Sequence, residues 1–158
     1  SEASKYHVLP LDDRFLVRAN AKMVGRPDLM AGRTSLTLGD GMTGMQENVF
    51  INVKNSSKSI TAVVDISDEV GHGTIIAQGG RFGGWSLYVN DGKPVYEYNF
   101  LGIQNSIISS SDKLSPGKST IRFEFAYDGG GMGKGGKGTL FVSDKKVGKG
   151  RIYDHFCR

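Results

Sequence analysis

A chain of 158 residues, 38% hydrophobic and 23% charged, has the size and balance of one folded domain, and its apolar runs are too short for a membrane helix. The net charge of +4 does not indicate a nucleic-acid partner, because residues 134–158 hold seven of the 20 Lys and Arg and two of the 16 Asp and Glu. We interpret this surplus as solvated charge at a sheet edge, where lysines hinder association between sheets. We therefore expect neither a membrane nor a nucleic acid as partner.

The N-terminal part of the chain does not have the pattern of a sandwich. Residues 1–8 predict the end of a helix, which Pro10 stops, and residues 15–34 show no clear hydrophobic period. We expect residues 1–34 to form a short helical or irregular linker from an upstream domain, and residues 35–158 to form the folded domain.

From Ser35 onward the chain consists of short segments in which apolar residues alternate, and 23 glycines supply tight turns. About ten strands are expected, at residues 35–38, 49–54, 59–66, 73–78, 85–90, 94–100, 103–109, 119–127, 139–143 and 147–153. No long amphipathic helix separates them, which argues against a parallel sheet. The fold class expected is all-β, an antiparallel β-sandwich of jelly-roll or concanavalin-like type.

One hairpin gathers aromatic residues and is the strongest candidate for a binding site. Asp-Gly at its turn joins residues 85–90 to residues 94–100. The candidate ligand-binding residues are Arg81, Trp85, Tyr96 and Tyr98. Aromatic rings can stack on a sugar while Arg pairs with a sulfate or carboxylate. Aromatic residues at period two are more often core, and this alternative, with Arg81 on a loop, is the interpretation that we favour.

The glycine-rich segment 131–138 partly matches the sequence pattern of a phosphate-binding loop. It has glycine, four residues and then Gly-Lys, but Gly138 occupies the position of the Ser or Thr that would hold magnesium. A strand is expected after it, whereas phosphate loops need a helix whose N-terminal amides bind the anion. We therefore expect a flexible loop between strands.

No arrangement of residues predicts catalysis or a metal site. The three histidines, His7, His72 and His155, each stand alone, and Cys157 gives only a two-member set with His155. The acidic pairs at residues 12–13 and 68–69 are interpreted as solvated turn charges rather than calcium ligands. We expect no catalytic residue, no metal and no cofactor in this chain.

Several long segments together resemble one family. They are YHVLPLDDR at 6–14, GRPDLMAGRTSLT at 25–37, MTGMQENVFINVK at 42–54, QGGRFGGWSLYVNDGKP at 78–94, YEYNFLG at 96–102 and RFEFAYDGGGMGKGGKG at 122–138. In this order they are similar to the C-terminal β-sandwich domain of bacterial-type arylsulfatases, over residues 5 to 152. Residues 153–158 do not match.

The resemblance implies an accessory domain of a larger enzyme. Sulfatases of this class hydrolyse sulfuric esters with a formylglycine made in a C/S-x-P-x-R motif and with a bound calcium ion. That motif is absent here, so the catalytic residues are expected upstream of Ser1. The partner expected is the catalytic domain of the same polypeptide, periplasmic or secreted, and a sulfated ester or glycan is a further candidate. The expected role is structural or substrate-gating, and the alternative is a carbohydrate-binding module.

Overall fold

The computed structural model describes residues 2–6, 25, 27, 29–67, 71–80, 82–131 and 133–153 of the chain. The chain divides into two compact units, residues 1–52 and residues 53–158. The described residues of the first unit contain the short helix α1 (Glu2–Lys5) and the 3-10 turn η1 (Glu47–Val49). Most of the linker predicted at residues 1–34 lies outside the described residues, so its boundary stays a prediction.

Two of the expected strands are wrong. Residues 35–38 and 49–54 form no sheet ladder, although Leu36 and Leu38 are less exposed than their neighbours, as alternation predicts. Alternation alone does not make a strand, because a strand also needs a neighbour to take its backbone hydrogen bonds.

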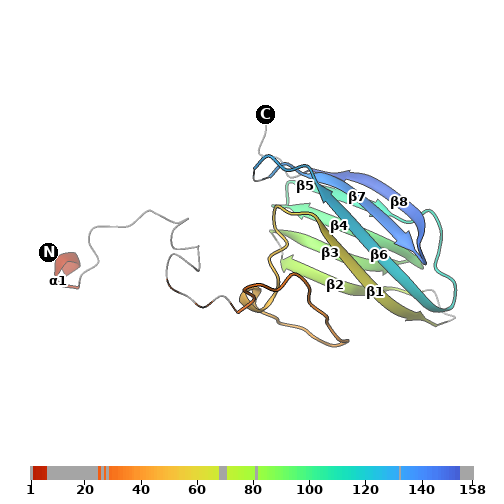
Figure 1. Ribbon diagram of the computed structural model, residues 1–158, viewed down its shortest axis with the longest axis horizontal. Coiled ribbons are helices and arrows are strands. Elements are labelled where there is room, and N and C mark those ends of the chain that lie inside the picture. The colour runs from red at the N-terminus through yellow and green to blue at the C-terminus, as the bar shows by residue number, and fades with distance from the viewer. Residues whose placement is uncertain are drawn as a thin grey trace. The chain divides into compact units, whose positions relative to one another are not determined.

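The second unit is an antiparallel sandwich of two four-stranded sheets, which confirms the predicted all-β fold (Figure 1). One sheet has the order β1-β6-β7-β8 and the other has the order β2-β3-β4-β5. The strands are β1 (Lys58–Ile66), β2 (Gly73–Gly80), β3 (Gly83–Asn90), β4 (Lys93–Phe100), β5 (Gln104–Ser109), β6 (Gly117–Tyr127), β7 (Gly136–Val142) and β8 (Lys145–Ile152). Eight strands are therefore found in the described residues, in place of about ten.

Tight turns set the register of two hairpins. Asp91 and Gly92 both have positive φ, 50° and 74°, in the turn between β3 and β4. Ser143 and Asp144 do the same between β7 and β8, with φ of 46° and 65°. Turns of this kind match the right-handed twist of the strands that they join. The Asp-Gly turn predicted from the sequence is confirmed.

The core is formed by side chains from both sheets. Tyr96 of β4 stacks on Phe123 of β6 with ring centroids 3.6 Å apart and planes at 8°, and the ring of Trp85 of β3 is 6.2 Å from that of Tyr96. The buried apolar residues are Trp85, Leu87, Val89, Val95, Tyr96, Ile108, Leu114, Ile121, Phe123, Leu140, Val147 and Ile152. Burial of a large aromatic side chain contributes several times the free energy of one methylene group, so this stack anchors the two layers.

A row of glycines lets the two sheets approach closely at one side. A Cβ atom on Gly138 of β7 would lie 2.4 Å from Cδ1 of Ile108, and one on Gly150 of β8 would lie 2.9 Å from its Cγ1. A Cβ on Gly148 would lie 2.7 Å from the carbonyl oxygen of Ser109. Strand β7 begins at Gly136, inside the segment expected to be loop, and a Cβ on Gly136 would collide with Ala126 and Phe125 of the neighbouring strand β6.

The glycine row gives a direct stability test. We expect Gly138→Ala to lower the free energy of unfolding by about 1–3 kcal/mol, because the added methyl overpacks against Ile108. Gly73→Ala is the matched control, since it is also a strand glycine and a Cβ there meets nothing within 4 Å. Urea unfolding of both variants measures the difference. Equal stabilities would contradict the close approach of β5 to β7.

Candidate functional site

The structure places the sequence-predicted aromatic residues at the inner face of the β2-β3-β4-β5 sheet. Trp85 is 8% exposed and Tyr96 is 1% exposed, while Tyr98 is half-buried. The Trp85 indole N–H donates a hydrogen bond to Gln78 Oε1 at 3.1 Å. Arg81 lies outside the described residues. The ligand-binding role of these four residues stays a prediction, and the burial of two of them leaves little aromatic surface for a ligand to reach.

The opposite face of the same hairpin carries polar side chains beyond Val95, an apolar residue of that face that is 6% exposed. Ser86 and Tyr88 of β3 alternate with Trp85 and Leu87, and they therefore face away from the core. Glu97 of β4 lies directly across the ladder from Ser86, and Asn99 lies across from Gly84. Asn105 of β5 lies across from Asn99 and extends the polar row by one strand.

A hollow of ≈ 330 Å³ opens at one end of this polar row. Its lining includes Gly79, Gly84, Ser86, Glu97 and Asn99. A Cβ on Gly79 would lie 2.3 Å from the Gly83 carbonyl oxygen, and a Cβ on Gly84 would lie 2.3 Å from the Gln78 carbonyl oxygen. Only glycine fits at these two positions, so bare backbone forms part of the lining.

Glu97 is held in a fixed orientation on the polar row. Its Oε2 accepts a hydrogen bond from the Tyr88 hydroxyl at 3.0 Å, and its Oε1 accepts one from Asn105 Nδ2 at 3.2 Å. Partial burial raises the pKa of Tyr88, and the hydrogen bond and charge of Glu97 raise it further, so this hydroxyl remains a donor. Asn99 Oδ1 accepts from the Gly102 amide at 2.8 Å, which leaves the Nδ2 hydrogens for other acceptors.

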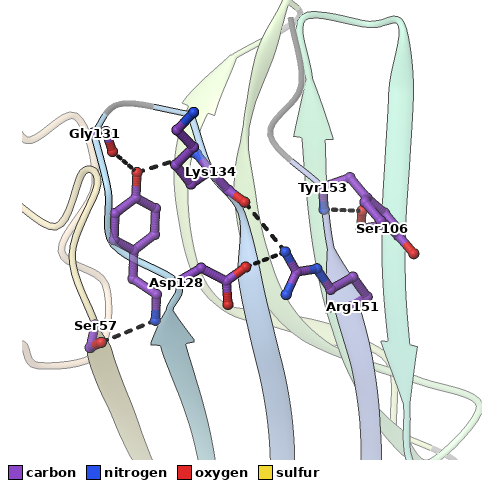
Figure 2. Close-up of polar contacts among 8 residues, drawn as sticks. Ser57, Ser106, Asp128, Gly131, Lys134, Arg151 and Tyr153 are labelled. Atoms are coloured by element: carbon purple, nitrogen blue, oxygen red, sulfur yellow. Dashed lines mark hydrogen bonds and ion pairs between the residues drawn. The ribbon is translucent and has the colours of Figure 1, made fainter. Parts of the chain in front are cut away.

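The glycine-rich loop between β6 and β7 uses its amides within the protein. The Lys134 amide donates to the Tyr127 hydroxyl at 3.2 Å, and the Gly133 amide donates to Asn55 Oδ1 at 3.0 Å. The Tyr127 hydroxyl in turn donates to the Gly131 carbonyl oxygen (Figure 2). Amides that already have acceptors are not free to hold a phosphate, and strand β7 follows the loop where a phosphate loop needs a helix.

An ion pair fastens the same loop to the edge strand β8. Arg151 pairs with Asp128, and its Nη2 also donates to the Lys134 carbonyl oxygen at 3.3 Å (Figure 2). The Asp128 hydrogen bond raises the pKa of Arg151, so the guanidinium stays charged. At the end of β6, where the loop begins, the Tyr127 amide donates a hydrogen bond to Ser57 Oγ at 3.0 Å. These contacts give the loop a structural role.

The described part of the chain contains no group of three or more His, Cys, Asp or Glu residues placed to hold a metal ion. His72 lies in the turn before β2, where its Nδ1 accepts a hydrogen bond from the Asp91 amide at 3.2 Å. His7, His155, Cys157 and the acidic pairs at 12–13 and 68–69 lie outside the described residues. None of the helices in the described ranges is long and apolar enough to cross a bilayer.

Comparison of the chain with protein-family models, with curated proteins and with solved structures found no match in any of the three.

The polar row was not predicted from the sequence, because only the aromatic residues of these strands were considered as a binding site. The signal was present in the same strands, since the alternation that places Trp85 and Tyr96 on one face places Ser86 and Glu97 on the other. The hollow itself could not be seen in the sequence. It depends on the pairing of Gly79 with Gly84 across the ladder.

The buried Tyr96 predicts a loss of stability at alkaline pH. Burial, and to a lesser extent the charge of Tyr98, raises the pKa of Tyr96 above its usual 10.0. The unfolded chain loses the phenolic proton from about pH 10 upward while the folded chain keeps it, so the free energy of unfolding falls as pH rises through that range.

We expect Tyr96→Phe to flatten this fall, measured by urea unfolding between about pH 9 and about pH 11. Tyr6→Phe, at a tyrosine that is 66% exposed, serves as the control and leaves the fall unchanged. An identical pH profile for wild type and Tyr96→Phe would show that Tyr96 ionises freely in the folded chain.

Proposed function

We propose that this chain is a non-catalytic accessory domain of an arylsulfatase, in which an upstream domain hydrolyses the sulfuric ester. The support is the resemblance of its segments, in order, to the C-terminal sandwich of that family. In that family the parent enzyme supplies formylglycine and calcium from residues outside this chain. The role proposed for the sandwich is to pack against the catalytic domain and to wall the entrance to its substrate.

The observation that carries this proposal is a group of exposed apolar side chains at one end of the β2-β3-β4-β5 sheet, which we name the apolar turn cluster. It consists of Phe82, Leu101 and Ile103, which are 74%, 48% and 76% exposed. The turns that bear them adjoin, because a Cβ on Gly83 would lie 3.4 Å from the Leu101 amide nitrogen. Apolar side chains grouped in this way are typical of a surface that another domain covers.

The occupant proposed for the apolar turn cluster is the catalytic domain of the same polypeptide. Phe82 and Leu101 lie in the segments at 78–94 and 96–102, which are among those that carry the resemblance. Docking would bury these side chains and stabilise the association by about 25 cal/mol for each Å² of apolar area removed from water.

The test uses the domain encoded upstream of Ser1, in which we expect a C/S-x-P-x-R motif. We expect that domain to bind this chain in trans, and the double variant Phe82→Ser, Ile103→Ser to bind at least about tenfold more weakly, because two interface side chains are truncated. Val63→Ser is the control, since Val63 is also 74% exposed but lies on β1. Calorimetry measures the affinity, and an aryl sulfate assay should show no turnover by this chain alone.

An upstream reading frame without the motif would overturn the sulfatase proposal. Equal weakening by the Val63 variant and the double variant would overturn the apolar turn cluster as the docking surface.

The polar hollow favours a second candidate function, a carbohydrate-binding module. Sugars are recognised through many hydroxyl groups, and they need oriented polar side chains rather than a purely apolar surface. The two candidates differ in where a partner binds, at the apolar turn cluster or on the polar row.

A further inference from the structure

We propose that the hollow beside Glu97 binds a neutral, hydroxyl-rich ring of a glycan, with the Glu97 carboxylate accepting hydrogen bonds from ligand hydroxyls. This inference rests on the second candidate function and is independent of sulfatase parentage. The site lies mainly on the outer face of the β2-β3-β4-β5 sheet, where Ser86 and Glu97 line it, and Trp85 is also among its lining residues.

The size of the hollow suits one or two sugar rings. Its ≈ 330 Å³ lies at the lower end of the range of about 300–1,000 Å³ for small-molecule sites. Glycine backbone at Gly79 and Gly84 forms part of its lining, and neither position tolerates a side chain, because a Cβ would collide with the backbone of the facing strand. Because Gly79 and Gly84 have no side chain, no side-chain movement at these two positions can close the hollow.

The polar groups of the hollow match the pattern of sugar hydroxyls. A carboxylate has about four acceptor sites, and Tyr88 and Asn105 occupy one on each oxygen of Glu97. The remaining acceptor sites can take two ligand O–H groups. Asn99 supplies Nδ2 donors, and Ser86, directly across the ladder from Glu97, supplies a hydroxyl that both donates and accepts.

The charge that Glu97 gives to the described lining of the hollow disfavours a sulfated ligand relative to a neutral one. Glu97 is the one charged residue among the described residues that line it, and no ion pair is found between Glu97 and a cation in the described structure. A sulfate or carboxylate group on the ligand would meet this carboxylate and be repelled. Hydrogen bonds from hydroxyls to an ionised acceptor are stronger than those between neutral groups, so Glu97 favours hydroxyls.

The experiment is an NMR titration of the ¹⁵N-labelled full chain with neutral oligosaccharides of glucose, galactose, mannose and xylose, and with a sulfated galactan oligosaccharide. We expect at least one neutral oligosaccharide to give saturable shifts at Gly79, Gly84, Ser86, Glu97 and Asn99. We expect the sulfated probe to bind more weakly than the neutral galactose oligosaccharide.

Two variants test the role assigned to the carboxylate. Glu97→Gln should weaken binding at least about tenfold, because it removes a charged acceptor while keeping the shape of the side chain. Glu124→Gln, on β6 of the other sheet, is the matched control and should leave the affinity unchanged. An unchanged Trp85 emission spectrum in both variants shows that the fold is intact.

Each other outcome overturns a defined part of the proposal. Absence of binding by every neutral oligosaccharide overturns this site and the second candidate function, and leaves the accessory-domain proposal untouched. Binding that Glu97→Gln and Glu124→Gln affect equally overturns the hollow as the site while keeping a binding module. Tighter binding of the sulfated probe overturns the selection for neutral ligands.

Discussion

The stack of Tyr96 on Phe123 is the contact on which the rest of the sandwich depends. It joins two inner strands, β4 of one sheet and β6 of the other, with ring centroids 3.6 Å apart. Once Tyr96 points inward, the alternation of a strand sends Glu97 outward, and the ladder with β3 places Ser86 beside it. A slip of one residue in β4 would exchange its two faces, so the register that builds the core also builds the polar row.

Glycines have two opposite structural effects in this fold. On β7 and β8, Gly138 and Gly150 let Ile108 of β5 approach, so the missing side chains bring the two sheets together. At the ends of β2 and β3, Gly79 and Gly84 leave a space that stays open to solvent and that we assign to a ligand. Glycine therefore allows close packing of the two sheets at one side and leaves a hollow at another. Which of the two occurs depends on what lies beside the missing side chain.

The sequence predicted the strands of the sandwich well because alternation and turn residues are local signals. The Asp-Gly turn and the segments around Trp85, Tyr96 and Phe123 all fall where alternation placed them. The strands expected at residues 35–38 and 49–54 were wrong because a partner strand cannot be read from a segment's own residues. The polar row was readable in principle, from Ser86 and Glu97 on the outer positions, but the hollow was not, since it needs the pairing of two distant glycines. The accessory-domain proposal rests on the sequence resemblance and on exposed apolar side chains. The glycan-site proposal rests on the geometry of one sheet face.

Both the core and the polar row require that the aromatic face of the hairpin lies inside the sandwich and the polar face outside. Trp85 is the only tryptophan of the chain, so its fluorescence reports on one side chain of that aromatic face. Acrylamide quenching of Trp85 measures its accessibility directly, and the account predicts quenching far weaker than that of free N-acetyltryptophanamide, as befits an indole that is 8% exposed. Quenching as efficient as that of the free compound, relieved by an added glycan, would place the aromatic face in solvent and contradict the assignment of the two faces.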